Sequence, residues 1–116
     1  MSDRSESVPP YTLTFGLGIP TDLAALHAVD PTALDAVEAI LDDLAHGRVT
    51  GKLLGDRHVS GDLTGLARVK FDIAGQRPQR FRLVYRQVDH KTRDVLAIGL
   101  RDEHAIYRLA TRRIAP

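Results

Sequence analysis

Apolar and basic residues alternate along three segments in the C-terminal half of the chain. Residues two apart share a face of a β-strand, so Arg68 and Lys70 point together, away from the apolar Val69. The same alternation recurs around Arg82. The pattern predicts three strands, near residues 67–73, 80–88 and 94–100. One face of their sheet is expected to form core, and the other to gather positive charge.

The N-terminal half combines one alternating segment with two helical patterns. Tyr11–Phe15 alternates apolar and β-prone polar residues, which predicts a first strand. A short helix is expected after Pro20, and Asp30 and Pro31 then supply an N-cap and a proline at the first helical position. Apolar residues at three- and four-residue spacing predict a second helix over about 31–46. These residues are Leu34, Val37, Ile40, Leu41 and Leu44.

The remaining segments are a glycine-rich connection and a C-terminal helix. Residues 47–65 hold five glycines and no clean period, which predicts a long connection, with a short extended piece near Val49–Leu54 as the alternative. Residues 103–112 have a helical pattern with Ile106, Leu109 and Ala110 inward. The order predicts an α+β fold in which an N-terminal strand and two helices precede an antiparallel sheet and a C-terminal helix, with helices covering one sheet face.

The composition of the chain fits one domain. Its 116 residues, 43% hydrophobic, are enough for a single core, so we expect a flexible N-terminal segment at 1–10 and one domain over 11–116. The absence of cysteine excludes disulfides, Cys-based zinc sites and thiol nucleophiles. No apolar run reaches the ~18–20 residues of a membrane span, and no signal peptide is evident, which predicts a soluble, cytoplasmic protein without a membrane partner.

Charge is divided unevenly along the chain, although the net charge is only +1. Residues 1–45 carry one basic and eight acidic side chains, whereas residues 46–116 carry fifteen basic and seven acidic ones. A polyanion would therefore be attracted by one part of the surface. The alternative is a set of solvated faces that aid solubility.

Common cofactor and metal motifs are absent from the sequence. Gly51 and Lys52 lack both the upstream glycine and the following Ser or Thr of a phosphate-binding loop. The five histidines are scattered, without the spacing of a metal site, and no Gly-x-Ser-x-Gly nucleophile motif occurs. We therefore expect neither a metal nor a cofactor.

The segments Leu63–Phe71, Phe81–Tyr85 and Ile98–Arg101, followed by Tyr107, resemble the RelE branch of the RelE/ParE toxin superfamily. The resemblance covers about residues 11–114 in element order. It implies the toxin of a type II toxin-antitoxin system, a ribosome-dependent endoribonuclease that cuts mRNA in the decoding site and is silenced by a cognate antitoxin. The family's functional positions fall on Arg68, Lys70, Arg82, Arg101 and Tyr107.

The reaction that this resemblance implies needs no metal. The ribose 2′-hydroxyl attacks the adjacent phosphorus, so negative charge develops on the phosphoryl oxygens and on the departing 5′-oxygen. Arg82, supported by Arg68, is expected to stabilise this charge, and losing one such donor commonly costs ~3–4 kcal/mol. Lys70 would stabilise charge or protonate the leaving oxygen, Arg101 would hold the phosphate, and Tyr107 would stack on or hydrogen-bond the nucleotide.

The general base is the open part of this mechanism. The family's first lysine is replaced by Arg68, and an arginine is effectively never deprotonated. His104 lies three residues from both Arg101 and Tyr107, so a helix would place it near both, and a pKa near 6.5 suits proton transfer. Its alternative is an exposed helix histidine. Asp72 is expected on the face of Arg68, where it orients the neighbouring lysine or weakens phosphate binding.

Other interpretations remain open at this point. The chain could be a ParE-like inhibitor of DNA gyrase, or a non-catalytic RNA-binding module or decayed toxin. Arg82 could instead be an ordinary strand arginine paired with Asp72 or Asp94, and Tyr107 could pack the last helix against the sheet. Tyr85 is expected in the core. Contacts with ribosomal RNA or solvent, without a chemical role, are expected of Arg108, Arg112 and Arg113.

Overall fold

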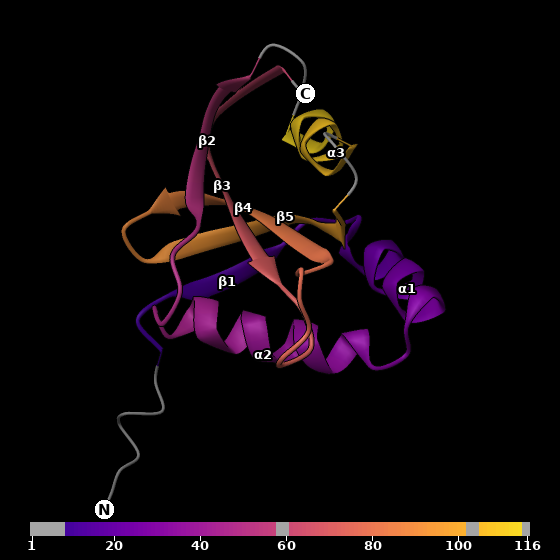
Figure 1. Cartoon of the computed structure of the whole chain (residues 1–116). Coiled ribbons are helices and arrows are strands. Elements are labelled where there is room, and N and C mark those ends of the chain that lie inside the picture. Colours follow the sequence, from indigo (N-terminus) through magenta and orange to yellow (C-terminus); the bar gives the residue numbers. More distant parts are fainter. Residues whose placement is uncertain (1–8, 58–60, 102–104, 115–116) are drawn as a thin grey trace, which may run out of the picture.

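Three helices and five strands make up the part of the chain that the computed structural model describes, residues 9–57, 61–101 and 105–114. In chain order they are β1 (Thr12–Phe15), α1 (Ile19–Val29), α2 (Ala33–Ala45), β2 (Lys52–Arg57), β3 (Gly61–Phe71), β4 (Phe81–Asp89), β5 (Thr92–Leu100) and α3 (Ala105–Ile114) (Figure 1). The predicted α+β fold is confirmed. The segment 1–10, predicted to be flexible, lies almost wholly outside the described residues.

The five strands form one mixed sheet in the order β1-β5-β4-β3-β2. The pairs β2–β3, β3–β4 and β4–β5 are antiparallel, which agrees with the antiparallel sheet predicted for the C-terminal half. β1 instead lies parallel to β5, with Thr12 opposite Thr92 and Phe15 opposite Val95. The first strand of the sequence therefore occupies a sheet edge beside the last one (Figure 1).

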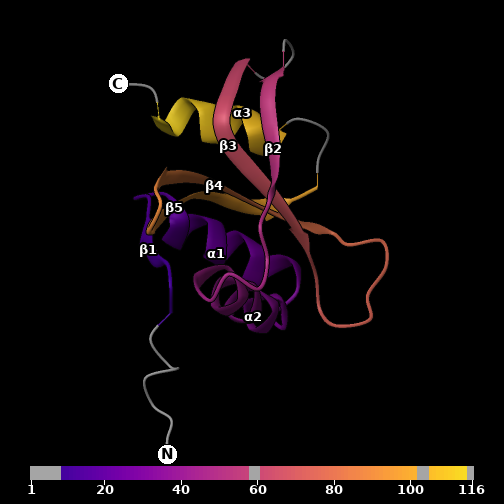
Figure 2. The same cartoon turned by 90° about the vertical axis from the view of Figure 1, so that its left-hand side faces the viewer.

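An antiparallel hairpin of β2 and β3 occupies much of the region 47–65, so the prediction of a long connection there is wrong. Backbone pairing places Lys52 opposite Arg68 and Arg57 opposite Gly61. Glycines and a shift of register within β2 interrupt the alternation on which strand prediction depends. The extended piece kept as an alternative overlaps the start of β2. Figure 2 shows the hairpin rising beside α3.

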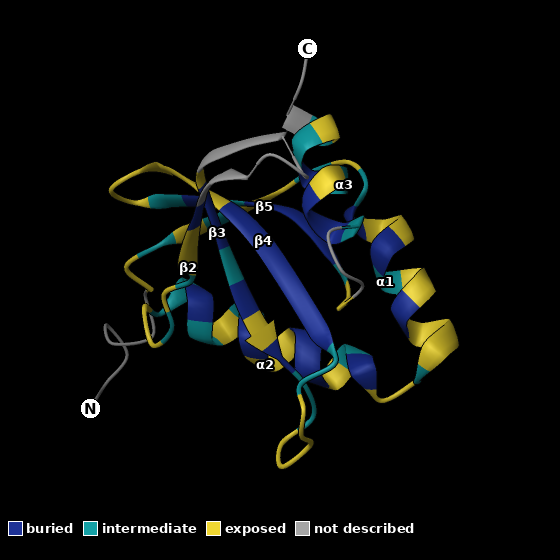
Figure 3. Cartoon of the chain, turned by 45° about the horizontal axis from the view of Figure 1, so that its top comes forward, coloured by how far each residue is buried: buried dark blue, intermediate teal, exposed yellow. Residues whose placement is uncertain are grey.

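Helices cover both faces of the sheet, not one face as predicted (Figure 1). α1 and α2 pack on one face and α3 on the other, each side over its own cluster of buried apolar side chains. The reason lies in β5, where every residue from Val95 to Ile98 is buried, so this strand is apolar on both faces. β4 is likewise buried from Phe81 to Tyr85 (Figure 3). The basic face therefore also contains a small core beneath α3.

The helices bury the apolar residues that their spacing indicates. α2 lies within the predicted range 31–46, and its hydrophobic stripe faces the sheet. α3 was predicted from residue 103 and is described from Ala105. Burial is confirmed at five of the positions predicted for these two helices, Val37, Ile40, Leu44, Ile106 and Ala110. Leu34, Leu41 and Leu109 are half-buried.

A buried arginine on β5 ties the sheet to the end of α2. The Nη1 atom of Arg93 donates to the carbonyls of Leu44 and Val49, at 2.9 and 3.0 Å. Its guanidinium carbon also lies 3.7 Å from the ring centroid of Tyr11 and 5.1 Å from that of Tyr85. Carbonyls at a helix C-terminus lack partners within the helix, so this cation is held by polar groups and aromatic faces.

Asp22 and Arg113 close the part of the β5 edge that β1 leaves uncovered. Both Nη atoms of Arg113 donate to the Asp22 carboxylate, at 2.8 and 2.9 Å, and the backbone N–H of Ile98 donates to it at 2.9 Å. Arg113 also donates to the carbonyl of Leu96 at 2.7 Å. A Cβ atom at Gly18 would lie 2.4 Å from the guanidinium, so a larger residue there would displace it. These bonds join α1 to α3 around the sheet edge.

Replacing Arg113 tests this junction. We expect Arg113→Gln to lower the free energy of unfolding by about 2–3 kcal/mol, because a mostly buried carboxylate loses its charged donor. Urea unfolding followed by circular dichroism measures the change. The neighbouring Arg112 is exposed, so Arg112→Gln should alter the free energy by less than about 0.5 kcal/mol. Equal losses in the two variants would contradict the assigned role.

Candidate functional site

Three of the predicted site residues share the face of the sheet that α3 covers. Lys70 on β3 lies directly opposite Arg82 on β4, and Arg68 lies opposite Val84. Directly opposed residues of antiparallel strands point to the same face. Val84 packs in the core beneath α3, so the three basic side chains belong to that face.

Tyr107 and Arg101 meet this group from the C-terminal end of the chain. The Nη1 atom of Arg68 lies 3.4 Å from the Tyr107 hydroxyl, at the long end of the hydrogen-bond range. Burial lowers the pKa of Arg82, Tyr107 raises it, and the positive charges of Arg68 and Arg101 lower it further. These mutual effects require the four side chains to lie within interaction range. The structure thus gathers residues from β3, β4, the end of β5 and α3.

Arg82 is buried at the centre of this group. It and Tyr107 are each only 6% exposed. Its Nη1 atom donates to the carbonyls of Gln79 and Phe81, at 3.0 and 2.9 Å. The alternative pairing of Arg82 with Asp72 or Asp94 is therefore wrong. The guanidinium remains cationic, because even a lowered arginine pKa stays far above neutrality.

Asp72 is directed away from the site, contrary to both roles suggested for it. Its carboxylate accepts hydrogen bonds from the backbone N–H, Nε and Nη2 of Arg80, at 2.8 to 2.9 Å. Arg80 also reaches Asp30, between α1 and α2, at 3.2 Å. The hydrogen bond from Arg80 lowers the pKa of Asp72 to about 2. The pair fixes the loop between β3 and β4.

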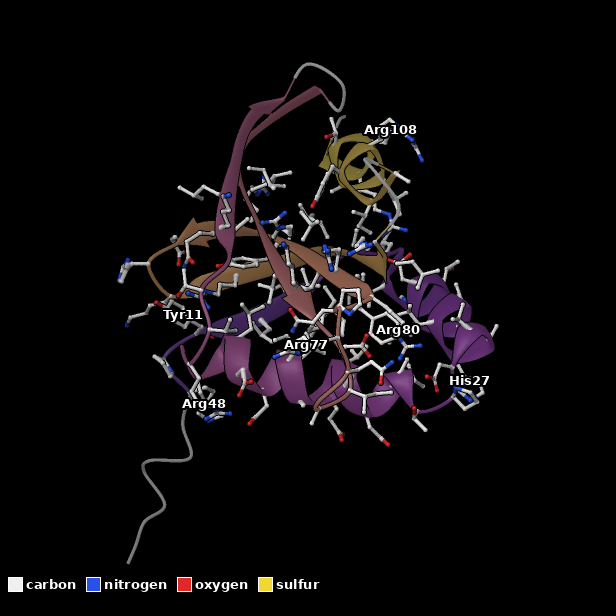
Figure 4. All side chains as sticks on the ribbon, viewed as in Figure 1. Tyr11, His27, Arg48, Arg77, Arg80 and Arg108 are labelled. Atoms are coloured by element: carbon white, nitrogen blue, oxygen red, sulfur yellow. The ribbon has the colours of Figure 1, made fainter. Side chains whose placement is uncertain are left out.

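Basic side chains differ in whether a carboxylate neutralises them. Arg48, Arg80 and Arg113 form ion pairs with aspartates. Arg48 and Arg80 lie on the α2 side of the sheet, whereas Arg108 lies with α3 on the opposite side (Figure 4). Besides Arg86, which lies opposite Leu66 on the same face, five cations on or next to the strands of the α3 face form no ion pair with a carboxylate whose side chain the structure describes. They are Lys52, Arg68, Lys70, Arg82 and Arg101.

The remaining predicted residues have separate outcomes. His104, the candidate base, lies outside the described residues, so its role stays a prediction. Tyr85 is a core residue, as predicted, since it is 1% exposed and its hydroxyl accepts the Gly51 N–H at 3.0 Å. Arg113 does not face solvent or an RNA partner freely, because it is bound to Asp22. Sequence reasoning missed Lys52, since its strand was hidden by glycines.

Neither of the two grooves described for these residues contains the five cations. A groove of about 230 Å³ between α1 and α3 is lined mostly by apolar side chains, and none of the five cations lines it. Among the described residues, no three potential metal ligands lie close enough to form a metal site. Nor is any helix within these residues long and apolar enough to cross a membrane. Contact with a ligand would therefore come from the strands and from α3.

No family model matches this chain, and no curated protein or solved structure shows significant similarity to it. A functional argument must therefore start from the residues themselves. The unneutralised basic group and its tyrosine are the features with the clearest chemistry.

The Asp72–Arg80 pair predicts a pH-dependent stability. The Asp72 side chain is fully buried, so Asp72→Asn should lower the free energy of unfolding at pH 7 by about 1–2 kcal/mol. Because the folded-state pKa of Asp72 is about 2 and the ordinary pKa of an aspartate is 3.8, this contribution is complete above about pH 4 and disappears as the pH falls towards 2. Urea unfolding across this range measures the difference between the two proteins.

The matched control is Glu38→Gln, an exposed position on α2. We expect it to change the free energy of unfolding by less than about 0.5 kcal/mol at neutral pH. A difference between wild type and Asp72→Asn that stays constant from pH 7 to pH 2 would refute the assigned pairing.

Proposed function

We propose that this protein is a metal-independent endoribonuclease, the toxin of a type II toxin-antitoxin system that cuts mRNA on the ribosome. The observation that carries the proposal is the group Arg68, Arg82, Arg101 and Tyr107, which lie within interaction range of one another and form no ion pair with a carboxylate whose side chain is described. The resemblance to RelE toxins places functional roles on these same residues. Lys70, opposite Arg82 and exposed, completes the set.

The chemistry follows from the charges. The 2′-oxygen attacks phosphorus and gives up its proton, and the 5′-oxygen leaves with a proton, which yields a 2′,3′-cyclic phosphate and a 5′-hydroxyl end. Lys70 and Arg101, both exposed, contact the phosphate, and Arg82, supported by Arg68, stabilises the charge that develops on it. The phenol of Tyr107, beside Arg68, hydrogen-bonds the nucleotide at the cut. His104 is the proposed proton acceptor, since its pKa range suits this role.

The ribosome supplies what this site lacks. Arg82 and Tyr107 are buried in the isolated protein, so a free RNA strand has little access to them. Binding in the decoding site would orient the mRNA and favour a conformation in which Arg82 and Tyr107 are accessible to it. The proposal accordingly gives the protein three partners, mRNA, the ribosome and a cognate antitoxin, and a place of action in the cytoplasm.

A second candidate function is RNA binding without cleavage. Burial of Arg82 favours it, because both bonds recorded for its Nη1 atom go to main-chain carbonyls and a structural role would explain them. This function needs only the exposed cations. Inhibition of DNA gyrase, the ParE-like alternative, needs no such basic group and has no comparable support.

Purified ribosomes programmed with a defined mRNA test the proposal. We expect cuts, mapped by primer extension, only when ribosomes and protein are both present. Arg82→Ala should reduce the cleavage rate by about 10²–10³-fold, as for removal of one charge-stabilising donor. Tyr107→Phe, which keeps the packing of α3, should reduce it about tenfold, equivalent to ~1.4 kcal/mol of the barrier.

Two further variants separate chemistry from folding. Lys70→Ala removes an exposed cation and should also slow cleavage, whereas Arg77→Ala removes an exposed arginine in the loop after β3 and should not. Intact mRNA with wild-type protein, together with salt-sensitive binding of RNA, would replace the proposal by the non-catalytic function. A gyrase supercoiling assay that showed inhibition would replace both.

A further inference from the structure

We infer that the basic surface extends across β3 onto β2 through Lys52, and that it binds a single-stranded phosphodiester chain of several nucleotides instead of one phosphate. This inference deepens the proposed function, because it rests on the same site and names the form of its substrate. Neither the resemblance nor any motif assigns a role to Lys52.

Register places Lys52 beside the predicted site. It lies directly opposite Arg68 in the β2–β3 pair, and directly opposed residues share a sheet face with Cβ atoms about 4.5–5.5 Å apart. Arg68 belongs to the α3 face, so Lys52 does too. Leu54, two residues further along β2, is buried in the core beneath α3, which supports the same orientation. The Lys52 side chain is exposed and has no carboxylate partner among the described residues.

The cations are spread across the strands. Neighbouring strands are about 4.8 Å apart and the rise is about 3.3 Å per residue, so Lys52 on β2 and Arg82 on β4, offset by two residues, start from positions about 12 Å apart, with Arg68 and Lys70 between them. Arg101, at the end of β5, extends the series by one more strand. A lone phosphate accepts charged hydrogen bonds at about 2.8 Å and would occupy only part of this series. A chain of phosphates matches its length.

The surface suits RNA better than an acidic protein segment. An amphipathic helix needs an apolar groove between its charged contacts. Leu53 is exposed but follows Lys52 directly on β2, so its side chain points to the face opposite α3. Leu100 is exposed too, but it lies opposite Phe81, whose side chain packs on the face that α1 and α2 cover. The α3 face offers positive charges and the side chain of Tyr107. Such groups bind the sugar-phosphate backbone of RNA without distinguishing its bases.

Salt-dependent binding of a fluorescein-labelled ten-nucleotide RNA, followed by fluorescence anisotropy without ribosomes, tests the inference. For single strands the slope of log K against log salt is about −0.7 per phosphate contacted. We expect Lys52→Ala to make this slope less steep by about 0.7 and to weaken binding several-fold at low salt. The decamer should bind wild type at least tenfold more tightly than a labelled dinucleotide. Lys91→Ala, an exposed lysine in the β4–β5 turn, should leave the slope unchanged.

Each result bears on the inference directly. An unchanged slope in Lys52→Ala, or equal affinity for dinucleotide and decamer, overturns it. The inference is also overturned if Lys52→Ala leaves the salt slope for RNA unchanged but weakens the binding of labelled polyglutamate, since the surface would then suit an acidic peptide. A reduced slope supports the inference even if ribosomes show no cleavage, and in that event only the ribonuclease proposal fails. Cleavage without any effect of Lys52→Ala on binding leaves the ribonuclease proposal intact and removes the extension onto β2.

Discussion

The Asp22–Arg113 pair holds together the two helical layers on which the candidate site depends. β1 covers only the first part of β5, and these two side chains bind the main chain of β5 beyond it. One comes from α1 and the other from α3, on opposite faces of the sheet. Arg113 lies six residues after Tyr107 on the same helix, so its anchorage fixes the register at which the tyrosine meets Arg68. A structural ion pair and a contact of the candidate site therefore share one short helix.

The distribution of carboxylates determines which basic side chains are neutralised by an ion pair. Aspartates neutralise the arginines that fasten loops and helices, and Arg93 is held by carbonyls and aromatic rings instead. The α3 face receives no such partner from the described residues. Burial beside two like charges lowers the pKa of Arg82, so its cationic form is kept there at an electrostatic cost. A bound anion would relieve that cost.

Much of the fold could be predicted because its patterns are local. The α2 stripe and the alternation around Arg68 and Arg82 gave the right elements and faces. Two features were missed, one because it depends on long-range packing and one because its local pattern is interrupted. α3 covers the second face because β5 is apolar on both sides, and glycines concealed β2, with Lys52 on it. The predicted direction of the Asp72 side chain was also wrong. Its pairing with Arg80 depends on how the loop between β3 and β4 folds back towards α1 and α2.

The parallel pairing of β1 with β5 joins residues that are far apart in the chain. Thr12 lies opposite Thr92, and Asp22 binds an arginine 91 residues later. Closing such long loops is slow and carries an entropic cost that local contacts do not. During synthesis, β1 and α1 emerge early but have no sheet edge to join until β5 and α3 follow them. The cation group and its tyrosine are thus assembled late, so a nascent chain remains without its candidate active surface for most of its translation.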